Sequence, residues 1–132
     1  MTKPENTVAV VTGGTRGIGL AIAEWLVKKK ASVAITYRGD QKAAESANRR
    51  LESFQTEKQR ILMLRGDAGD ADVVAEHHRI VRTELGPIGI LVNNAGIMPA
   101  RNFEQISVQD WDETIRVNLN SAFYWCRQVV AD

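Results

Sequence analysis

The chain has 132 residues, of which 44% are hydrophobic and 25% charged, and its formal net charge at pH 7 is +1. Length and composition predict one globular domain, and the charge gives no reason to expect nucleic acid as a partner. No apolar run reaches the length of a membrane span and the N-terminus is polar, so we expect no membrane association and a cytoplasmic location. The single cysteine, Cys126, excludes an internal disulfide and a thiolate metal cluster.

Apolar strands alternate with amphipathic helices along the chain, a pattern typical of a parallel sheet with helices on both faces. The expected strands cover residues 8–12, 32–37, 61–65 and 88–92. The expected helices begin near Ile18, after Asp40 as N-cap, at Asp70 or Asp72, and after Ser107 as N-cap. We therefore predict an α/β fold of the Rossmann type, a doubly wound parallel sheet in one domain of residues 1–132.

Three of these helices carry apolar residues at steps of three and four, which predicts buried stripes. In the helix after Asp40 the stripe is Ala44, Ala47, Leu51 and Phe54. In the next helix it is Val73, Val74, His77, Ile80, Val81 and Leu85, with His77 as a packing residue. In the last segment it is Trp111, Ile115, Leu119, Ala122, Phe123, Cys126 and Val130.

Two glycine-containing turns follow expected strands. The first reads Thr12-Gly13-Gly14-Thr15-Arg16-Gly17-Ile18-Gly19, and the second reads Asn93-Asn94-Ala95-Gly96. Gly13, Gly17 and Gly19 allow a tight turn and a close approach to a pyrophosphate, and the helix behind them offers free N–H groups and its positive dipole end. A turn of this kind predicts nucleotide binding.

Both turns, complete and in this order, resemble the signature of the short-chain dehydrogenase/reductase family. The resemblance covers about Asn6 to Asp132 and is nearest to 3-oxoacyl-acyl-carrier-protein reductases. It implies a nicotinamide cofactor, hydride transfer between a carbonyl and an alcohol, and a homo-oligomer. It also implies the strand order 3-2-1-4, with the sheet truncated before the family's last three strands. Strand 88–92 would then be an open edge, from which we expect association with another chain.

The resemblance implies several cofactor contacts. Thr15, Arg16 and Ile18 would contact phosphate or ribose, and Asp67 and Ala68 would contact the adenine ring. Asn94, Ala95 and Gly96 would border the nicotinamide ribose. Asp67 could instead be a simple turn residue. Asn93 and Asn94 could be structural ties between strands, and this role can hold together with the role at the cofactor.

The end of the second strand favours NADP over NAD. Enzymes that use NAD usually place an acid there, to accept hydrogen bonds from the ribose hydroxyls. Tyr37 and Arg38 stand there instead, and a guanidinium can bind a 2′-phosphate with two hydrogen bonds. Arg16 is a second cation within reach of the same phosphate. The alternative is that Arg38 only solvates the end of the strand.

One catalytic residue of the family matches this chain. Asn118, in Val117-Asn118-Leu119-Asn120, corresponds to the family's asparagine in the proton relay, and its alternative is a structural asparagine that bonds to its own helix. The family's Tyr-x-x-x-Lys is absent, because Gln41 and Gln128 stand four positions after Tyr37 and Tyr124. We therefore expect the amino-terminal half of an NADP-dependent reductase with a small-molecule carbonyl or alcohol substrate, inactive alone.

Two other functions remain open at this point. One is a non-catalytic nucleotide-binding and interaction module, and the other is a split enzyme completed by a second polypeptide. We expect no metal site, because the glycines and helix starts account for the aspartates of residues 67–72. The acidic residues Glu104, Asp110, Asp112 and Glu113 are expected to be solvated surface.

Overall fold

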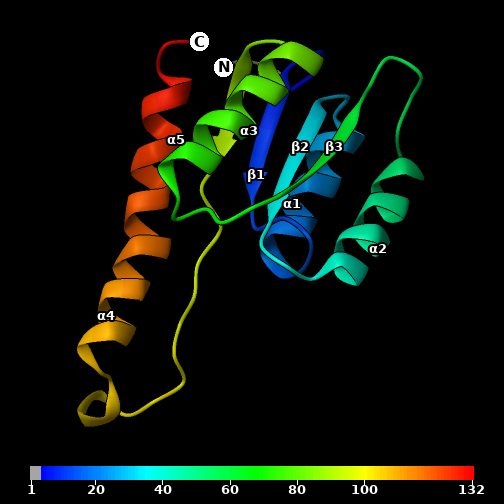
Figure 1. Cartoon of the computed structure of the whole chain (residues 1–132). Coiled ribbons are helices and arrows are strands. Elements are labelled where there is room, and N and C mark those ends of the chain that lie inside the picture. Colours follow the sequence, from blue (N-terminus) through cyan, green and yellow to red (C-terminus); the bar gives the residue numbers. More distant parts are fainter. Residues whose placement is uncertain (1–3) are drawn as a thin grey trace.

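Four parallel strands form one sheet in the order β3-β2-β1-β4 (Figure 1). The computed structural model describes residues 4–132. The strands are β1 (Val8–Thr12), β2 (Ser32–Tyr37), β3 (Ile61–Arg65) and β4 (Ile88–Val92). All four strands have the predicted bounds, and the predicted order is confirmed, with β4 at an edge of the sheet.

Helices fill the connections between the strands. They are α1 (Gly17–Lys28), α2 (Gln41–Glu52), α3 (Ala71–Glu84), α4 (Val108–Ile115) and α5 (Ser121–Val129). A π-helical segment, Arg116–Asn120, joins α4 to α5, and a 3-10 turn, Phe103–Gln105, precedes α4. The last segment predicted from the sequence is therefore one long rod with a π-helical interruption (Figure 1).

Polar side chains begin three of the helices. Asp40 accepts a hydrogen bond from the third residue of α2, as predicted. Asp70, rather than Asp72, begins α3, because its carboxylate accepts from the first free backbone N–H groups of that helix. Ser107 and Asp110 form a reciprocal capping box at the start of α4. These short-range hydrogen bonds explain why the helix starts could be predicted from the sequence.

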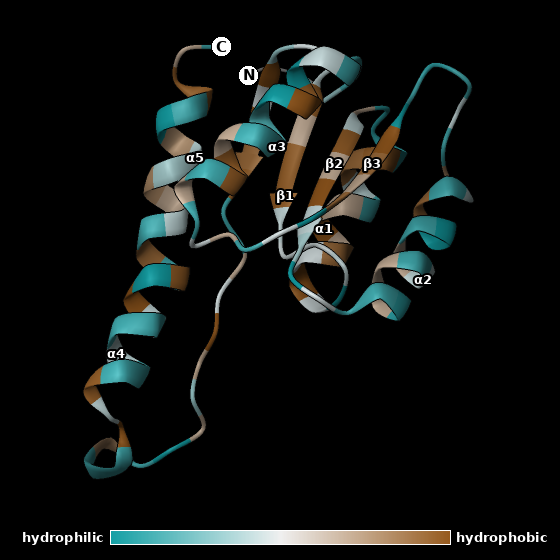
Figure 2. Ribbon diagram, viewed as in Figure 1, coloured by the Kyte–Doolittle hydropathy of each residue, from teal (hydrophilic) through white to brown (hydrophobic). Residues whose placement is uncertain are grey.

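The helices cover both faces of the sheet, so the doubly wound architecture is confirmed. Leu26 of α1 and Leu51 of α2 pack on one face, whereas Val81 of α3 and Trp125 of α5 pack on the other. The strands β1 and β2 are buried on both faces, as central strands of a parallel sheet are. Figure 2 shows these strands as mostly hydrophobic and the outer surface of α2 as mostly hydrophilic.

The predicted buried stripe of the last segment is wrong. The predicted positions that are exposed are Trp111, Leu119, Phe123, Cys126 and Val130. The buried side chains are instead Val117, Ser121 and Trp125, and Trp125 is 1% exposed against α3 and β4. Both faces of this rod carry apolar residues at helical spacing. The periodicity therefore identifies an apolar stripe but not the surface it packs against.

Two smaller predictions have opposite outcomes. Phe54 was expected inside, but it lies beyond the end of α2, is 37% exposed, and has Lys28 Nζ 4.2 Å from its ring centre. His77 is buried as expected, and its Nε2 lies 3.2 Å from the carbonyl oxygen of Arg65. Burial lowers the pKa of His77, so this imidazole is neutral at physiological pH.

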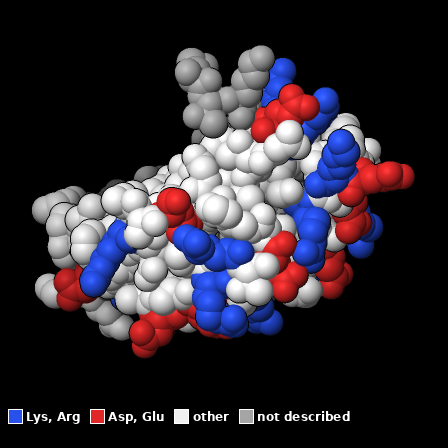
Figure 3. Space-filling view, turned by 90° about the horizontal axis from the view of Figure 1, so that it is seen from above, with Lys and Arg blue, Asp and Glu red and all other residues white. Residues whose placement is uncertain are grey.

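Among residues 4–132 there is no helix with the length and apolar character that crossing a membrane requires. On the face shown in Figure 3, Lys and Arg side chains are interspersed with Asp and Glu side chains. This mixture agrees with the near-zero net charge.

Gln59 is a buried polar residue that ties α1 to the start of β3. Its Nε2 donates to the carbonyl oxygens of Val27 and Ala31, both at 2.7 Å. Its Oε1 accepts from the backbone N–H and the hydroxyl of Thr56, both at 2.9 Å. Every hydrogen-bonding group of this amide is therefore used within the fold.

We predict that Gln59→Ala lowers the free energy of unfolding by about 2–3 kcal/mol, because the Val27 and Ala31 carbonyl groups each lose a donor, the Thr56 N–H loses its acceptor, and a cavity opens. Urea unfolding measures this change. Gln109→Ala, at an exposed position of α4, is the matched control and should change the free energy of unfolding by less than about 0.5 kcal/mol. Equal effects of the two substitutions would contradict the role assigned to Gln59.

Candidate functional site

The two glycine-containing turns are joined to each other by hydrogen bonds. The Thr12 hydroxyl accepts from the backbone N–H groups of Asn94 and Ala95, both at 3.0 Å. In return, Asn94 Nδ2 donates to the carbonyl oxygens of Thr12 and Gly13, both at 3.0 Å. Asn94 therefore has the structural role that the sequence left open. Asn93 does not share it, because its Nδ2 donates to the sulfur of Cys126 at 3.4 Å.

The close fit of these turns explains the glycines. Gly13 has a φ of +63°, and a Cβ on it would lie 2.9 Å from the Cα of Ala95. A Cβ on Gly19 would lie 2.7 Å from the carbonyl oxygen of Gly13 and 2.5 Å from Asn94 Nδ2. Gly17 is different: its φ is +56°, but its Cβ position faces open space. The first two positions are required by packing, and the third by backbone conformation.

The start of α1 is open to an anion. Arg16 is its N-cap residue, and no side chain within residues 4–132 hydrogen-bonds to the first N–H groups of this helix. Its first turn also carries no acidic side chain. The free N–H groups and the positive end of the helix dipole are therefore available to phosphate oxygens.

A pocket of about 390 Å³ opens beside these turns, at the carboxyl ends of the strands. Most of the predicted cofactor residues line it: Gly13, Thr15, Arg16, Tyr37, Arg38, Asp67, Ala68, Asn94, Ala95 and Gly96. Gly17, Ile18 and Gly19 are not among the lining residues, and the Ile18 side chain is 74% exposed. Residues that the sequence did not single out, Gly39 and Ile97 among them, complete the lining.

Two arginines, Arg16 and Arg38, belong to the pocket lining. Arg38 follows β2 and its side chain is 62% exposed. Arg16 reaches the same pocket from the glycine turn, 3.9 Å from the carboxylate of Asp40. The Tyr37 hydroxyl donates to Gln41 Oε1 at 2.7 Å, so the position of the missing acid is occupied by a neutral group. Two guanidinium groups therefore line the pocket, Arg16 next to the carboxylate of Asp40 and Arg38 next to that of Glu113.

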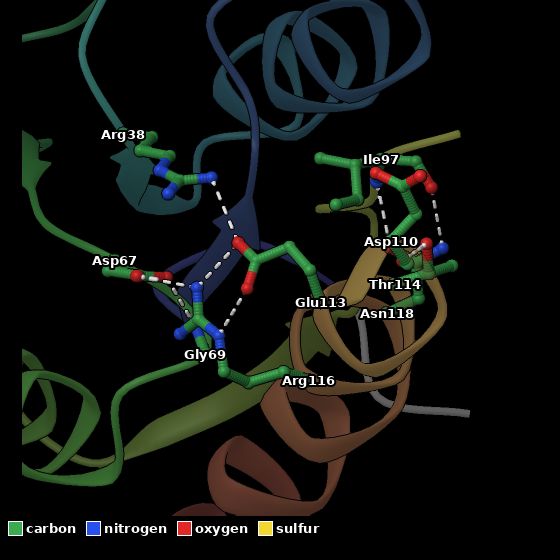
Figure 4. Close-up of polar contacts among 9 residues, drawn as sticks. All are labelled: Arg38, Asp67, Gly69, Ile97, Asp110, Glu113, Thr114, Arg116 and Asn118. Carbon is green, nitrogen blue, oxygen red and sulfur yellow. Dashed lines mark hydrogen bonds and ion pairs between the residues drawn. The ribbon is translucent and has the colours of Figure 1, made fainter. Parts of the chain in front are cut away.

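A network of alternating charges borders the pocket beside these cations (Figure 4). Arg116 Nη2 donates to Asp67 at 2.9 Å and to Glu113 at 2.8 Å, and Arg116 Nε donates to Glu113 at 2.8 Å. Glu113 Oε1 lies 3.5 Å from Arg38. Glu113 is therefore at the surface, as predicted, but its carboxylate is paired with Arg116 and Arg38. Its partner Arg116 is a residue that the sequence did not point to, although Glu and Arg three positions apart on a helix are a known pairing.

The charges of this network are mutually stabilised. Burial acts to raise the pKa of Asp67, but hydrogen bonds from Arg116 and from the Gly69 amide outweigh it and hold that pKa below its ordinary value. The hydrogen bond from Arg116 likewise lowers the pKa of Glu113, and those two carboxylates raise the pKa of Arg116. Asp67 is therefore an ionised group that only accepts hydrogen bonds at neutral pH.

Asn118 lies in the π-helical segment and holds the turn after β4. Its Oδ1 accepts from the backbone N–H of Ile97 at 2.7 Å, and its Nδ2 donates to the carbonyl oxygen of Ile97 at 2.8 Å. The alternative in which Asn118 bonds to its own helix is not found, because both amide groups point to Ile97 (Figure 4). Asn118 thus connects the last rod to the Asn93–Gly96 turn.

The geometry fits a dinucleotide. Glycines without room for side chains meet an uncapped helix start, cations lie at the end of β2, and an ionised acceptor, Asp67, lies beyond β3. Among the described residues, 4–132, no cluster of three or more His, Cys, Asp or Glu side chains is arranged to hold a metal ion.

Comparison with known proteins identifies the family. The family profile described as short chain dehydrogenase matches residues 7–132. Acetoacetyl-CoA reductase of Paracoccus denitrificans is 40% identical over 116 residues, which make up 88% of this chain and 45% of that protein. The 3-oxoacyl-acyl-carrier-protein reductase of Staphylococcus epidermidis is 32% identical over 124 residues, 94% of this chain and 50% of that protein. The chain belongs to the short-chain dehydrogenase/reductase family.

Solved structures of related proteins superpose on nearly the whole of this chain. A short chain dehydrogenase from Burkholderia cenocepacia in complex with NADP is 32% identical and superposes with a TM-score of 0.90, over 98% of this chain and 52% of that one. A blue fluorescent protein from a metagenomic library in complex with NADPH is 30% identical and superposes with a TM-score of 0.88, over 99% of this chain and 53% of that one. The chain thus spans about half the length of these relatives.

We predict that Gly19→Ala destabilises the fold by about 1–3 kcal/mol, because its Cβ must displace the backbone of the glycine turn. The same change in an exposed helix would ordinarily stabilise by about 1 kcal/mol, so the sign is diagnostic. Urea unfolding gives the sign. Gly39→Ala is the control, since its Cβ position faces open space at a negative φ, and it should leave stability nearly unchanged. A stabilised Gly19→Ala protein would refute the close fit of the turns.

Proposed function

We propose that this chain is the dinucleotide-binding part of an NADP-dependent oxidoreductase that transfers hydride between NADP(H) and a carbonyl or alcohol. The observation that carries the proposal is the pocket itself. Gly13, Thr15 and Arg16 of the glycine turn, which leads into the uncapped start of α1, line this pocket, and Arg38 lines it after β2, where NAD enzymes place an acid.

In this proposal each part of the cofactor is bound by particular residues of the chain. The N–H groups of the glycine turn and the start of α1 bind the pyrophosphate. Arg38 and Arg16 bind the 2′-phosphate, and Asp67 accepts a hydrogen bond from the adenine amino group. Ala95 and Gly96 leave room for the nicotinamide ribose, because small side chains let the cofactor approach the backbone. When bound, the nicotinamide supplies or accepts the hydride.

Asn118 is the residue of this chain to which we assign a part in catalysis. It holds the backbone of Ile97 at the end of the pocket proposed for the nicotinamide, where it would keep a water of the proton relay in place. The 132 residues carry no Tyr-x-x-x-Lys. We therefore propose that the chain by itself binds the nucleotide without turning over a substrate, in a cytoplasmic protein that assembles into a homo-oligomer.

We predict that Arg38→Ala weakens NADPH binding by about 10-fold and changes NADH binding by less than about twofold, because NADH lacks the 2′-phosphate that the guanidinium binds. Isothermal titration calorimetry measures both affinities. Arg49→Ala removes an arginine of α2 that lies outside the pocket lining and serves as the control.

If Arg38→Ala weakened the binding of NADPH and NADH equally, Arg38 would not bind the 2′-phosphate. The proposed preference for NADP would then be refuted. Failure of the unmodified chain to bind either nucleotide would refute the proposed function altogether.

A further inference from the structure

Arg116 stands between two carboxylates and makes a different contact with each. Toward Glu113 it presents two parallel N–H groups from Nε and Nη2, both at 2.8 Å, so the plane of the guanidinium is fixed by its own helix. Toward Asp67, forty-nine positions away in the sequence, it presents Nη2 at 2.9 Å. The helix thus carries a rigid donor to a carboxylate that lines the pocket.

The loop after β3 is shaped to receive that donor. Gly69 is buried, its N–H donates to Asp67 Oδ1 at 2.9 Å, and Arg116 donates to Asp67 Oδ2. A Cβ on Gly69 would meet the Arg116 guanidinium, with Cζ only 2.9 Å away. The φ of Gly69 is not in the left-handed region, so the glycine is needed here for space and not for backbone conformation. Each oxygen of Asp67 is therefore held by one donor, and each retains further acceptor capacity.

We infer that Arg116 is a positioning residue: it fixes the orientation of the Asp67 carboxylate, so that the pocket accepts a base with an amino group at position 6 and rejects a base with a carbonyl there. This inference rests on the proposed function, in which Asp67 faces the base of the nucleotide. Glu113 and Gly69 support Arg116, the first by holding its guanidinium and the second by leaving room for it.

The physical reason lies in what a free carboxylate can do. Adenine presents an amino donor at position 6, whereas hypoxanthine presents a carbonyl acceptor at position 6 and an N–H donor at the neighbouring position 1. A carboxylate that can rotate would find the N–H of hypoxanthine and bind both bases. A carboxylate held by two donors cannot follow, and its negative charge then faces the carbonyl oxygen. Positioning, more than charge, is what separates the two bases.

The experiment measures four affinities of the 132-residue chain by isothermal titration calorimetry: NADPH, NADH, and the analogues of each in which hypoxanthine replaces adenine. Comparing both pairs separates the effect of the base on affinity from the effect of the 2′-phosphate. We expect an adenine preference of about 10-fold in the unmodified chain. In Arg116→Gln the preference should fall to about twofold or less.

Gly69→Ala is the second variant. It removes no charge, but its methyl group displaces Arg116 from Asp67, so the adenine preference should fall as it does in Arg116→Gln. Arg79→Gln is the matched control, because Arg79 makes the same two-bond pair with Glu76 three positions earlier on α3, outside the pocket lining. This control should keep the full preference. Circular dichroism verifies that each variant is folded.

Three results would overturn the inference. An unmodified chain that binds both bases equally would show that Asp67 does not read the base. A full adenine preference in both Arg116→Gln and Gly69→Ala would show that Arg116 does not position Asp67. Loss of the preference in Arg116→Gln alone would assign the effect to charge instead of orientation. A chain that binds none of the four nucleotides refutes the proposed function itself, and this outcome is distinct from the other three.

Discussion

The reciprocal hydrogen bonding of Thr12 and Asn94 is the constraint on which the site depends. One hydroxyl and one side-chain amide join the end of β1 to the end of β4, two strands that are eighty residues apart in sequence but adjacent in the sheet. The Thr12 hydroxyl and the Asn94 Nδ2 group are committed to these contacts within the protein. Their function is to set the position of the glycine turn relative to the turn after β4, so that the space between them has a fixed width.

The segments around the pocket are held in two different ways. β1 and β2 are buried on both faces, so the ends of these strands are held by the core of the sheet. The last rod contributes Val117 to the lining, and beside the pocket its Glu113 and Arg116 reach across to groups that follow β2 and β3. Surface ion pairs of this kind add little to stability, and their value here is geometric. The glycine-turn side of the pocket is therefore held by backbone packing, and the side near Asp67 by side-chain contacts.

Much of the fold and part of the site could be predicted from the sequence, because their causes are local. The strand bounds follow from apolar runs, the helix starts from Asp40, Asp70 and Ser107, and the glycine turn from its glycine spacing between a strand and a helix. The sequence left open whether Asn94 is structural, borders the cofactor or does both, since its partners lie about eighty positions away.

The remaining features depend on pairings between distant elements. Nothing in the sequence connects Arg116 to Asp67, because a guanidinium and a carboxylate on separate elements meet only if the fold brings them together. The prediction of which face of the last rod is buried was wrong for a related reason. Val117 and Trp125 form one apolar stripe and Leu119 and Phe123 form another, and both satisfy the helical period. Only the positions of α3 and β4 decide which stripe is covered.

The π-helical segment Arg116–Asn120 constrains how this region can change length during evolution. Each residue of an α-helix turns the chain by about 100°, and a π turn accommodates one residue more than the α-helix around it. Loss of a single residue here would convert the segment to regular α-helix and rotate α5 against α4. Either Trp125 would leave the core, or Arg116 and Asn118 would lose their contacts with Asp67 and Ile97. Point substitutions are therefore easier to accommodate in this rod than insertions or deletions, and the number of residues between Glu113 and Trp125 is itself under structural constraint.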